Sequence, residues 1–282
     1  MNLSMRKFVV TLVLVVCAGV LYASLYPNSS PQTKVSNKKV KKSGIVLCTW
    51  NVAHYFAYGS ARNVIDGPIY KSKLKSFREI IYDSIKADLI SLNEYSIVFG
   101  MDEDSIKHLS SDVLFDGYNT WIEGGSTKHG VGNNAIYSNA RMGNFQKHEF
   151  DYNKTRKSEN SHDYYYLSSD LYIDRVPVKF VGVYLIHSKK DPSLVQNQIA
   201  ELIEKFKDEK RIVMCGDFNT SNYSKFKKAG YSLANDGSII TFYKTSKSLD
   251  NVVAKGVRIS DVRTVKTELS DHYPLVCRLS ID

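Results

Sequence analysis

The chain has 282 residues, enough for one large domain or two small ones beside a leader of a few dozen residues. Its content of 43% hydrophobic, 12% aromatic and 24% charged residues is ordinary for a globular protein and excludes disorder over most of its length. The formal net charge is +9, but residues 1–42 contain seven basic residues and no acidic one. The rest of the chain is therefore nearly neutral, and overall basicity is weak support for a nucleic-acid partner.

The N-terminal segment has the pattern of an export signal. Arg6 and Lys7 precede an uncharged stretch over residues 8–25, which is the layout of a signal peptide and is also long enough to span a bilayer. Residues 1–26 are therefore predicted to be either a cleaved signal peptide or an uncleaved membrane anchor. Residues 27–43 are rich in Pro, Ser, Asn and Lys and are predicted to form a flexible linker. We expect a protein that is secreted or anchored on the extracytoplasmic face of a membrane.

Residues 44–282 are expected to form one domain of mixed α and β structure. Two stretches, 71–86 and 193–207, carry apolar residues at helical spacing and are predicted helices. Short apolar runs rich in β-branched residues predict strands at 45–49, 89–92, 134–137, 165–173, 179–185, 211–215, 251–254 and 275–279.

The cysteines point to packing. Cys48, Cys215 and Cys277 each lie inside an apolar run, where cysteine acts as a small hydrophobic residue, and Cys17 lies in the leader. No spacing between them resembles a zinc site. They are predicted to be buried free thiols.

Several of the apolar runs end in polar residues that are costly to bury and able to bind a metal. Carboxylates beside apolar strands must be paired, hydrogen-bonded or bound to a cation. An oxygen-rich set without cysteine favours Mg²⁺, Mn²⁺ or Ca²⁺ over zinc. The polar ends are Trp50-Asn51, Asn93-Glu94, Gly216-Asp217-Phe218-Asn219, Leu249-Asp250-Asn251 and Ser270-Asp271-His272.

The order of these motifs resembles the endonuclease/exonuclease/phosphatase superfamily, over nearly the whole span 45–279. The resemblance implies an α+β fold, a four-layer α/β/β/α sandwich of two mixed β-sheets flanked by helices. Two positions depart from the pattern, because Asn93 replaces the commoner Gln and Asn251 replaces a His or Arg. The motifs that carry the resemblance are Thr49-Trp50-Asn51, the strand over residues 87–94 that ends in Glu94, Gly216-Asp217-Phe218-Asn219 and Ser270-Asp271-His272-Tyr273-Pro274.

One histidine indicates which branch of this superfamily the sequence resembles. His187 follows an apolar run at the place where the abasic-site endonuclease branch usually has a tyrosine. It is therefore similar to the two-histidine branch, which includes secreted deoxyribonucleases, sphingomyelinases and inositol-phosphate phosphatases. Tyr184 remains a rival for the same alignment position.

The resemblance also implies roles for the polar residues. Metal ligation falls to Glu94 with Asn51, and Asp271 completes the acidic cluster. Phosphodiester hydrolysis also needs an activated water and proton donors or acceptors. The residues implied for these tasks are Asp217 and Asn219 for the water and the phosphate, His272 supported by Asp250 as general base or phosphate ligand, and His187 as acid or phosphate donor.

Three further residues have weaker assignments. Asn134, in a Gly-Asn-Asn-Ala sequence, is expected either to line the substrate site or to be a turn residue that bonds the backbone. Glu123 is a candidate for orienting His187, and a purely structural role is the alternative. Gln198 is expected to give structural support.

The leading functional hypothesis is an exported, Mg²⁺-dependent phosphodiesterase that cleaves DNA or RNA, acting as a monomer. A second hypothesis is a phosphoesterase acting on phospholipid, sphingomyelin or inositol phosphate near the membrane to which an uncleaved leader would attach it. A third is a non-catalytic surface module that binds a partner through tyrosine-rich segments such as 164–166.

Overall fold

The computed structural model describes residues 43–53, 75–95, 118–123, 133–151, 164–187 and 192–281. The chain divides into two units, Met1–Lys42 and Ser43–Asp282, and the second contains all of these segments. The predicted signal or anchor and nearly all of the predicted linker lie outside the described residues. No helix within the described segments is long and apolar enough to cross a membrane.

Within these segments, twelve strands form two six-stranded sheets. Sheet A has the order β11-β12-β1-β2-β4-β3, and sheet B has the order β5-β6-β7-β8-β10-β9. Both are mixed, because β1 runs parallel to β2 and β7 runs parallel to β8 while the other pairs are antiparallel. The strands are β1 (Ile45–Asn51), β2 (Leu89–Tyr95), β3 (Asn119–Glu123), β4 (Asn133–Ser138), β5 (Met142–Glu149), β6 (Tyr165–Ile173), β7 (Val176–Tyr184), β8 (Ile212–Asp217), β9 (Ser232–Leu233), β10 (Asp250–Lys255), β11 (Arg258–Thr264) and β12 (Leu275–Ser280).

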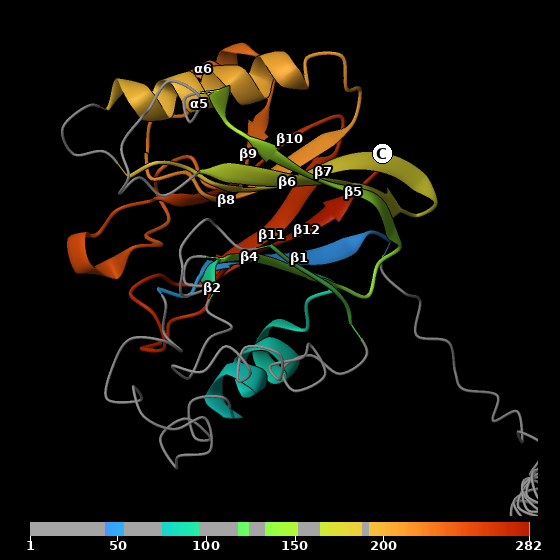
Figure 1. The fold of residues 1–282 in the computed structure, drawn as a ribbon. Helices are drawn as coiled ribbons and strands as arrows, with labels where there is room; N and C mark the ends of the chain where they lie inside the picture. Colours follow the sequence, from blue (N-terminus) through green and yellow to red (C-terminus); the bar gives the residue numbers. More distant parts are fainter. Residues whose placement is uncertain are drawn as a thin grey trace, which may run out of the picture. The chain divides into compact units, whose positions relative to one another are not determined.

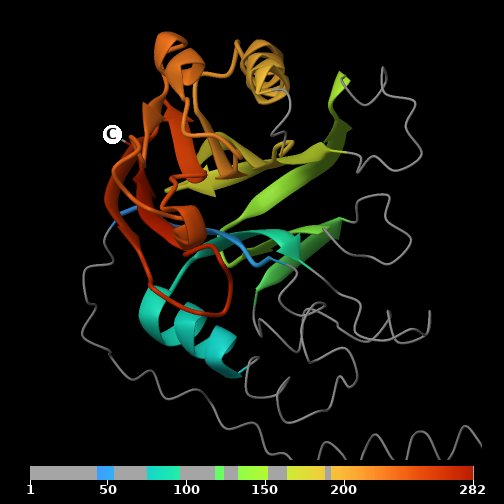
Figure 2. The same cartoon turned by 90° about the vertical axis from the view of Figure 1, so that its left-hand side faces the viewer.

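The sheets pack face to face, and helices cover the outer face of each (Figures 1 and 2). Residues 75–79 form an α-helix that continues as the π-helix η1 (Ile80–Ile85) over sheet A. The helices α5 (Ser193–Lys205) and α6 (Ser224–Lys228) cover sheet B. A short 3-10 helix, η3 (Tyr243–Thr245), lies between β9 and β10.

Three separate hydrophobic cores correspond to the three interfaces of a four-layer sandwich. Successive strand residues face opposite sides of a sheet, so Leu47 of β1 joins the core between the sheets while Cys48 joins the core under the helix of residues 75–85. In β8, Val213 faces sheet A while Met214 packs under α5 and α6. The predicted α/β/β/α sandwich is therefore confirmed.

The eight predicted strands and both predicted helices form, with ends that differ by a few residues, and residues 71–74 of the first helix lie outside the described residues. The sequence did not predict β3, β5, β9 or β11. Strands β5 and β11 are sheet edges whose side chains are mostly exposed or half-buried, so they lack the apolar runs by which strands were predicted. The three domain cysteines are buried and free, as predicted.

Gly216, immediately before Asp217, marks a close approach between β8 and β7. Its φ of +145° is a conformation that residues with a side chain rarely adopt. A Cβ atom built there would lie 1.9 Å from the carbonyl oxygen of Val183. The glycine therefore lets β8 deliver Asp217 to the end of the sandwich.

Replacing Gly216 by alanine is expected to lower the free energy of unfolding by about 2 kcal/mol or more, because both the backbone strain and the clash with Val183 oppose it. Urea denaturation followed by circular dichroism measures this. Gly143→Ala is the matched control, since a Cβ there meets no atom within 4 Å. Equal stability of the two variants would contradict the packing described.

Candidate active site

The strand pairing gathers polar side chains from both sheets at one end of the sandwich. In sheet A, Asn51 at the end of β1 lies beside Asn93, which precedes Glu94 in β2. In sheet B, Asp217 ends β8 and pairs with Asp250, the first residue of the antiparallel β10. The ends of these four strands therefore bring Asn51, Glu94, Asp217 and Asp250 to the same end of the sandwich.

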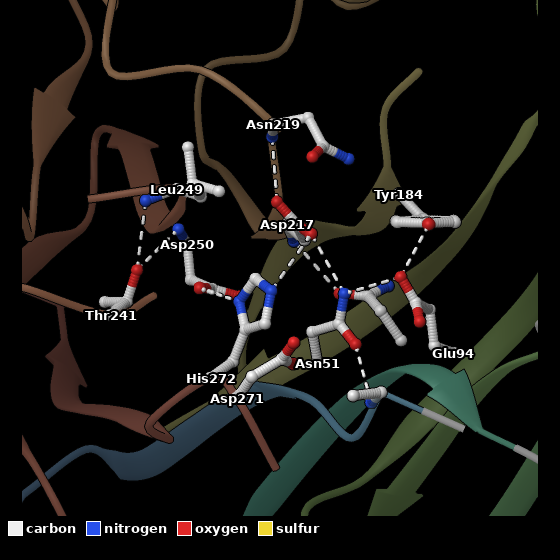
Figure 3. A network of polar contacts seen from close by, with 12 residues as sticks. Asn51, Glu94, Tyr184, Asp217, Asn219, Thr241, Leu249, Asp250, Asp271 and His272 are labelled. Carbon is white, nitrogen blue, oxygen red and sulfur yellow. Dashed lines mark hydrogen bonds and ion pairs between the residues drawn. The ribbon is translucent and has the colours of Figure 1, made fainter. Parts of the chain in front are cut away.

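The side-chain amide of Asn51 connects the two sheets (Figure 3). Its Nδ2 donates to Glu94 Oε1 at 3.0 Å and to Asp217 Oδ2 at 2.9 Å, while its Oδ1 accepts from the backbone N–H of Ala53 at 2.8 Å. Ser270 Oγ donates to the backbone carbonyl of Asn51 at 2.7 Å. The amide therefore holds two carboxylates from different sheets within reach of one small ligand.

A second buried amide, Asn93, fixes the position of Asp217. Its Nδ2 donates to Asn134 Oδ1 and to the carbonyl oxygen of Val183, each at 2.9 Å. Its Oδ1 accepts from the backbone N–H of Asp217 at 2.9 Å. Because Asn93 belongs to sheet A and Val183 and Asp217 to sheet B, these bonds fix the spacing of the sheets at the site.

His272 forms a buried pair with Asp250. The ring Nδ1 lies 2.7 Å from Asp250 Oδ2, and Nε2 points toward Asp217 with 3.9 Å to its Oδ2 (Figure 3). Thr241 Oγ1 accepts the backbone N–H groups of Leu249 and Asp250, each at 3.0 Å, which fixes the start of β10. The aspartate thereby orients the imidazole toward the carboxylate at the end of β8.

Burial and neighbouring charges alter the acidity of this pair. Burial disfavours the charged ring, but the carboxylates of Asp250 and Asp217 outweigh it and raise the pKa of His272 to about 10. Burial, followed by the charge of Asp250, raises the pKa of Asp217 well above the usual range of a carboxyl group. The two carboxyl groups beside the imidazole therefore favour its protonated form.

The arrangement of elements is similar to several solved structures. The endonuclease/exonuclease/phosphatase from Bacteroides vulgatus has a TM-score of 0.62 at 14% identity, covering 86% of this chain and 100% of that chain. D. rerio TDP2 complexed with single strand DNA product has a TM-score of 0.60 at 12% identity, covering 84% and 99%. The human Nocturnin catalytic domain with bound sulfate anion has a TM-score of 0.59 at 15% identity, covering 86% and 95%.

The chain has the endonuclease/exonuclease/phosphatase fold. Models of known protein families and curated protein sequences give no match to it. The motifs on which the sequence resemblance rests lie at the end of the sandwich described above, on β1, β2, β8 and the segment that precedes β12.

Most of the predicted site residues lie in or beside one network of contacts. Asn51, Glu94, Asp217, Asp250 and His272 form one connected network. Asp271 borders this network (Figure 3). Its Oδ2 accepts from Lys244 Nζ at 2.9 Å.

Within the described part of the chain, the side chains of three other predicted residues do not contact the carboxyl groups of the network. Asn219 donates its backbone N–H to Asp217 Oδ1 at 2.8 Å, but its side-chain Nδ2 is bonded to the carbonyl of Leu185. Asn134 is buried against Asn93. His187 is exposed, and within the described segments no hydrogen bond or ion pair joins it to the network. The side chain of Glu123 lies outside the described residues.

The oxygen atoms of the network fit a hard divalent cation. Glu94, Asp217, Asp250 and Asp271 contribute four carboxyl groups, whereas the cations that contact them in the described network are His272 and Lys244. Asp217, Asp250 and His272 offer ligand atoms within 4.8 Å of one another. However, Asp250 Oδ2 is already engaged by His272 Nδ1 at 2.7 Å, so the oxygens of Asn51 and Glu94 are the better ligands.

Tyr184 belongs to the network although it was considered only as a rival of His187. Its hydroxyl donates to Glu94 Oε1 at 2.7 Å, and burial raises the pKa of this phenol well above its usual value. Thr241 and Ser270 were also missed as supports. Their signal was weak because a hydroxyl in a loop has no characteristic spacing from the carboxylate or amide that it contacts.

The two departures from the superfamily pattern have structural explanations. Asn93 makes the contacts between sheets described above. Asn251 is fully buried. Its Nδ2 donates to the backbone carbonyl of Asn235 at 2.7 Å, and its Oδ1 accepts from the backbone N–H of Asn235 at 2.9 Å. Gln198 accepts the backbone N–H of Ile186 at 2.8 Å, a supporting contact one residue before His187.

Asn93→Ala is expected to lower the free energy of unfolding by about 3 kcal/mol, because it leaves the buried N–H of Asp217 and the carbonyl of Val183 without their partner. Urea denaturation of the variant tests this. Asn139→Ala is the control, because Asn139 is exposed and its backbone contact is kept. A loss below 1 kcal/mol for Asn93→Ala would show that the amide does not hold the sheets together.

Proposed function

We propose that this chain is an exported, metal-dependent phosphodiesterase that hydrolyses DNA or RNA by attack of a water molecule, acting as a monomer. The single observation that carries the proposal is the geometry of His272, which Asp250 holds and which faces the Asp217 carboxylate that Asn51 joins to Glu94. Such a site offers a donor for phosphate oxygens beside an acceptor for a proton from water.

The chain's own groups account for most of the reaction. When bound by Asn51 and Glu94 with Asp271 beside them, a divalent cation, Mg²⁺ or alternatively Mn²⁺ or Ca²⁺, supplies positive charge to the phosphate oxygens. Asp217 takes a hydrogen bond and then a proton from the attacking water, a task that suits a carboxylate of raised pKa.

His272 lies beside Asp217, with its Nε2 3.9 Å from Asp217 Oδ2. Of the two roles open to it, its raised pKa favours donation from Nε2 to a phosphate oxygen over the role of general base. Asp250 keeps Nδ1 engaged, so that only Nε2 faces the substrate. We assign His187, which is exposed, and Asn219 and Asn134 to substrate contacts that form with the phosphodiester.

The similar structures support a nucleic-acid substrate over a lipid. D. rerio TDP2 was solved with single strand DNA product, which is the support for nucleic acid. Nocturnin was solved with sulfate, a tetrahedral oxyanion like the phosphate of either substrate class. The pattern of residues 1–26 supports export, as a secreted or membrane-anchored protein. The two-histidine branch is supported by His187 alone.

The whole chain, supplied with Mg²⁺ or Mn²⁺, is expected to cleave plasmid DNA or RNA, and EDTA is expected to stop the cleavage. His272→Ala should lower kcat by about 100-fold or more, because it removes a charged donor to the phosphate. His148→Ala is the matched control and should retain activity. His148 stacks on Tyr166 and bonds Ser168 in sheet B, and it is no part of the network.

The same assay includes sphingomyelin and inositol phosphates. If these compounds are hydrolysed and nucleic acid is not, the phospholipid or inositol-phosphate alternative is favoured instead. Absence of any hydrolysis, together with a thermal midpoint that metal does not change, would support the non-catalytic binding module.

A further inference from the structure

The hairpin that connects β9 and β10 exposes apolar and basic side chains beside the site. Three large hydrophobic side chains are exposed in the described residues, and two of them, Ile240 and Tyr243, belong to this hairpin. Tyr243 is 38% exposed. The hairpin also carries Lys244 and Lys247, and it projects at the end of the sandwich where β2 and β8 end (Figure 1). Of these groups, only Lys244 contacts the network of the hydrolytic site, through Asp271.

Backbone and ring contacts fix this hairpin to the segment that contains His272. The ring of Phe242 packs on the imidazole of His272 with 4.8 Å between centroids. The backbone N–H of Tyr243 donates to the carbonyl of Asp271 at 3.2 Å, and that of Tyr273 donates to the carbonyl of Thr241 at 2.7 Å. Tyr243 is therefore held at a set position relative to the hydrolytic site.

The exposed ring of Tyr243 is one half of a flat aromatic pair. It stacks on Tyr273 with 5.3 Å between centroids and 23° between planes, so the Tyr273 ring backs it from one side. Lys244, the next residue, reaches the Asp271 carboxylate at 2.9 Å while its side chain is 59% exposed. An aromatic surface and an ammonium group thus lie together at the border of the network.

We propose that Tyr243, backed by Tyr273, is a subsite that stacks an unpaired nucleobase, with Lys244 contacting a phosphate of the same strand. This inference rests on the proposed function, which it narrows to single-stranded nucleic acid. Bases stack on aromatic side chains irrespective of sequence, and lysines beside them contact the backbone. Lys244 exchanges its exposed ion pair with Asp271 for the phosphate at little cost, because such pairs contribute little in water.

The geometry favours a base over a lipid surface. Insertion into a membrane interface uses apolar side chains that project into the acyl boundary, whereas Tyr243 lies flat against Tyr273 and is tied through its backbone to Asp271. A rigid flat ring matches the face of a nucleobase. Ile240, the other exposed apolar residue of the hairpin, is not part of the pair.

The test is an equilibrium affinity without turnover. Fluorescein-labelled octathymidylate, and the same oligonucleotide with every base replaced by tetrahydrofuran, are titrated with the whole chain in EDTA and followed by anisotropy. The wild type is expected to bind octathymidylate about 10-fold more tightly than the abasic strand, a ratio in the range of one stacked base. Tyr243→Ala should remove most of this difference and leave the abasic affinity unchanged, whereas Tyr243→Phe should keep it.

Phe145→Ala is the matched control, because Phe145 is exposed to a similar extent on β5, at the opposite edge of sheet B from β9. It should bind both strands like the wild type. Equal affinities of the wild type for the two strands, or an unchanged ratio in Tyr243→Ala, would overturn the subsite. So would a Tyr243→Ala variant that loses binding to anionic phospholipid vesicles while its affinity for octathymidylate is unchanged. Failure of the proposed function would appear instead as absent cleavage in the substrate assay, which is independent of these affinities.

Discussion

The hydrogen bonds from one amide, that of Asn51, to carboxylates of both sheets are the interaction on which the site depends. Buried carboxyl groups repel one another and lose their hydration, so they stay together only where donors or cations compensate. Asn51 supplies donors to Glu94 and Asp217 at once, and the His272 ring supplies a positive charge beside Asp217. The proposed divalent cation would add the compensation that these groups alone do not provide.

The sandwich explains why such an arrangement can form. Each sheet contributes the ends of adjacent strands, and the core between the sheets fixes how far apart those ends lie. The side chain of Asn93 then reaches from β2 to the backbone of β7 and β8. Its hydrogen bonds fix the distance between the two sheets at the site. Gly216 allows the last residues of β8 to pass close to Val183. The candidate chemistry therefore depends on contacts between sheets more than on any single loop.

Much of this organisation could be predicted from the sequence, because apolar runs followed by Asn, Asp or Glu mark strands that end at a polar site. The predictions failed where a local pattern was missing. Strand β5 is a polar edge, and the contact of Tyr184 with Glu94 depends on how two sheets pack. Lys244 and Asp271 are 27 positions apart, and only the folded hairpin brings them together. The role of Glu123, whose side chain lies outside the described residues, stays a prediction from the resemblance alone.

The most direct test of the account is the position of a bound divalent cation. Crystals of the protein grown with Mn²⁺ and measured at a wavelength where manganese scatters anomalously would locate it without reference to activity. We predict an anomalous peak within bonding distance of the oxygen atoms of Asn51 and Glu94. A peak confined to Asp217, Asp250 and His272, or no peak at this end of the sandwich, would contradict it.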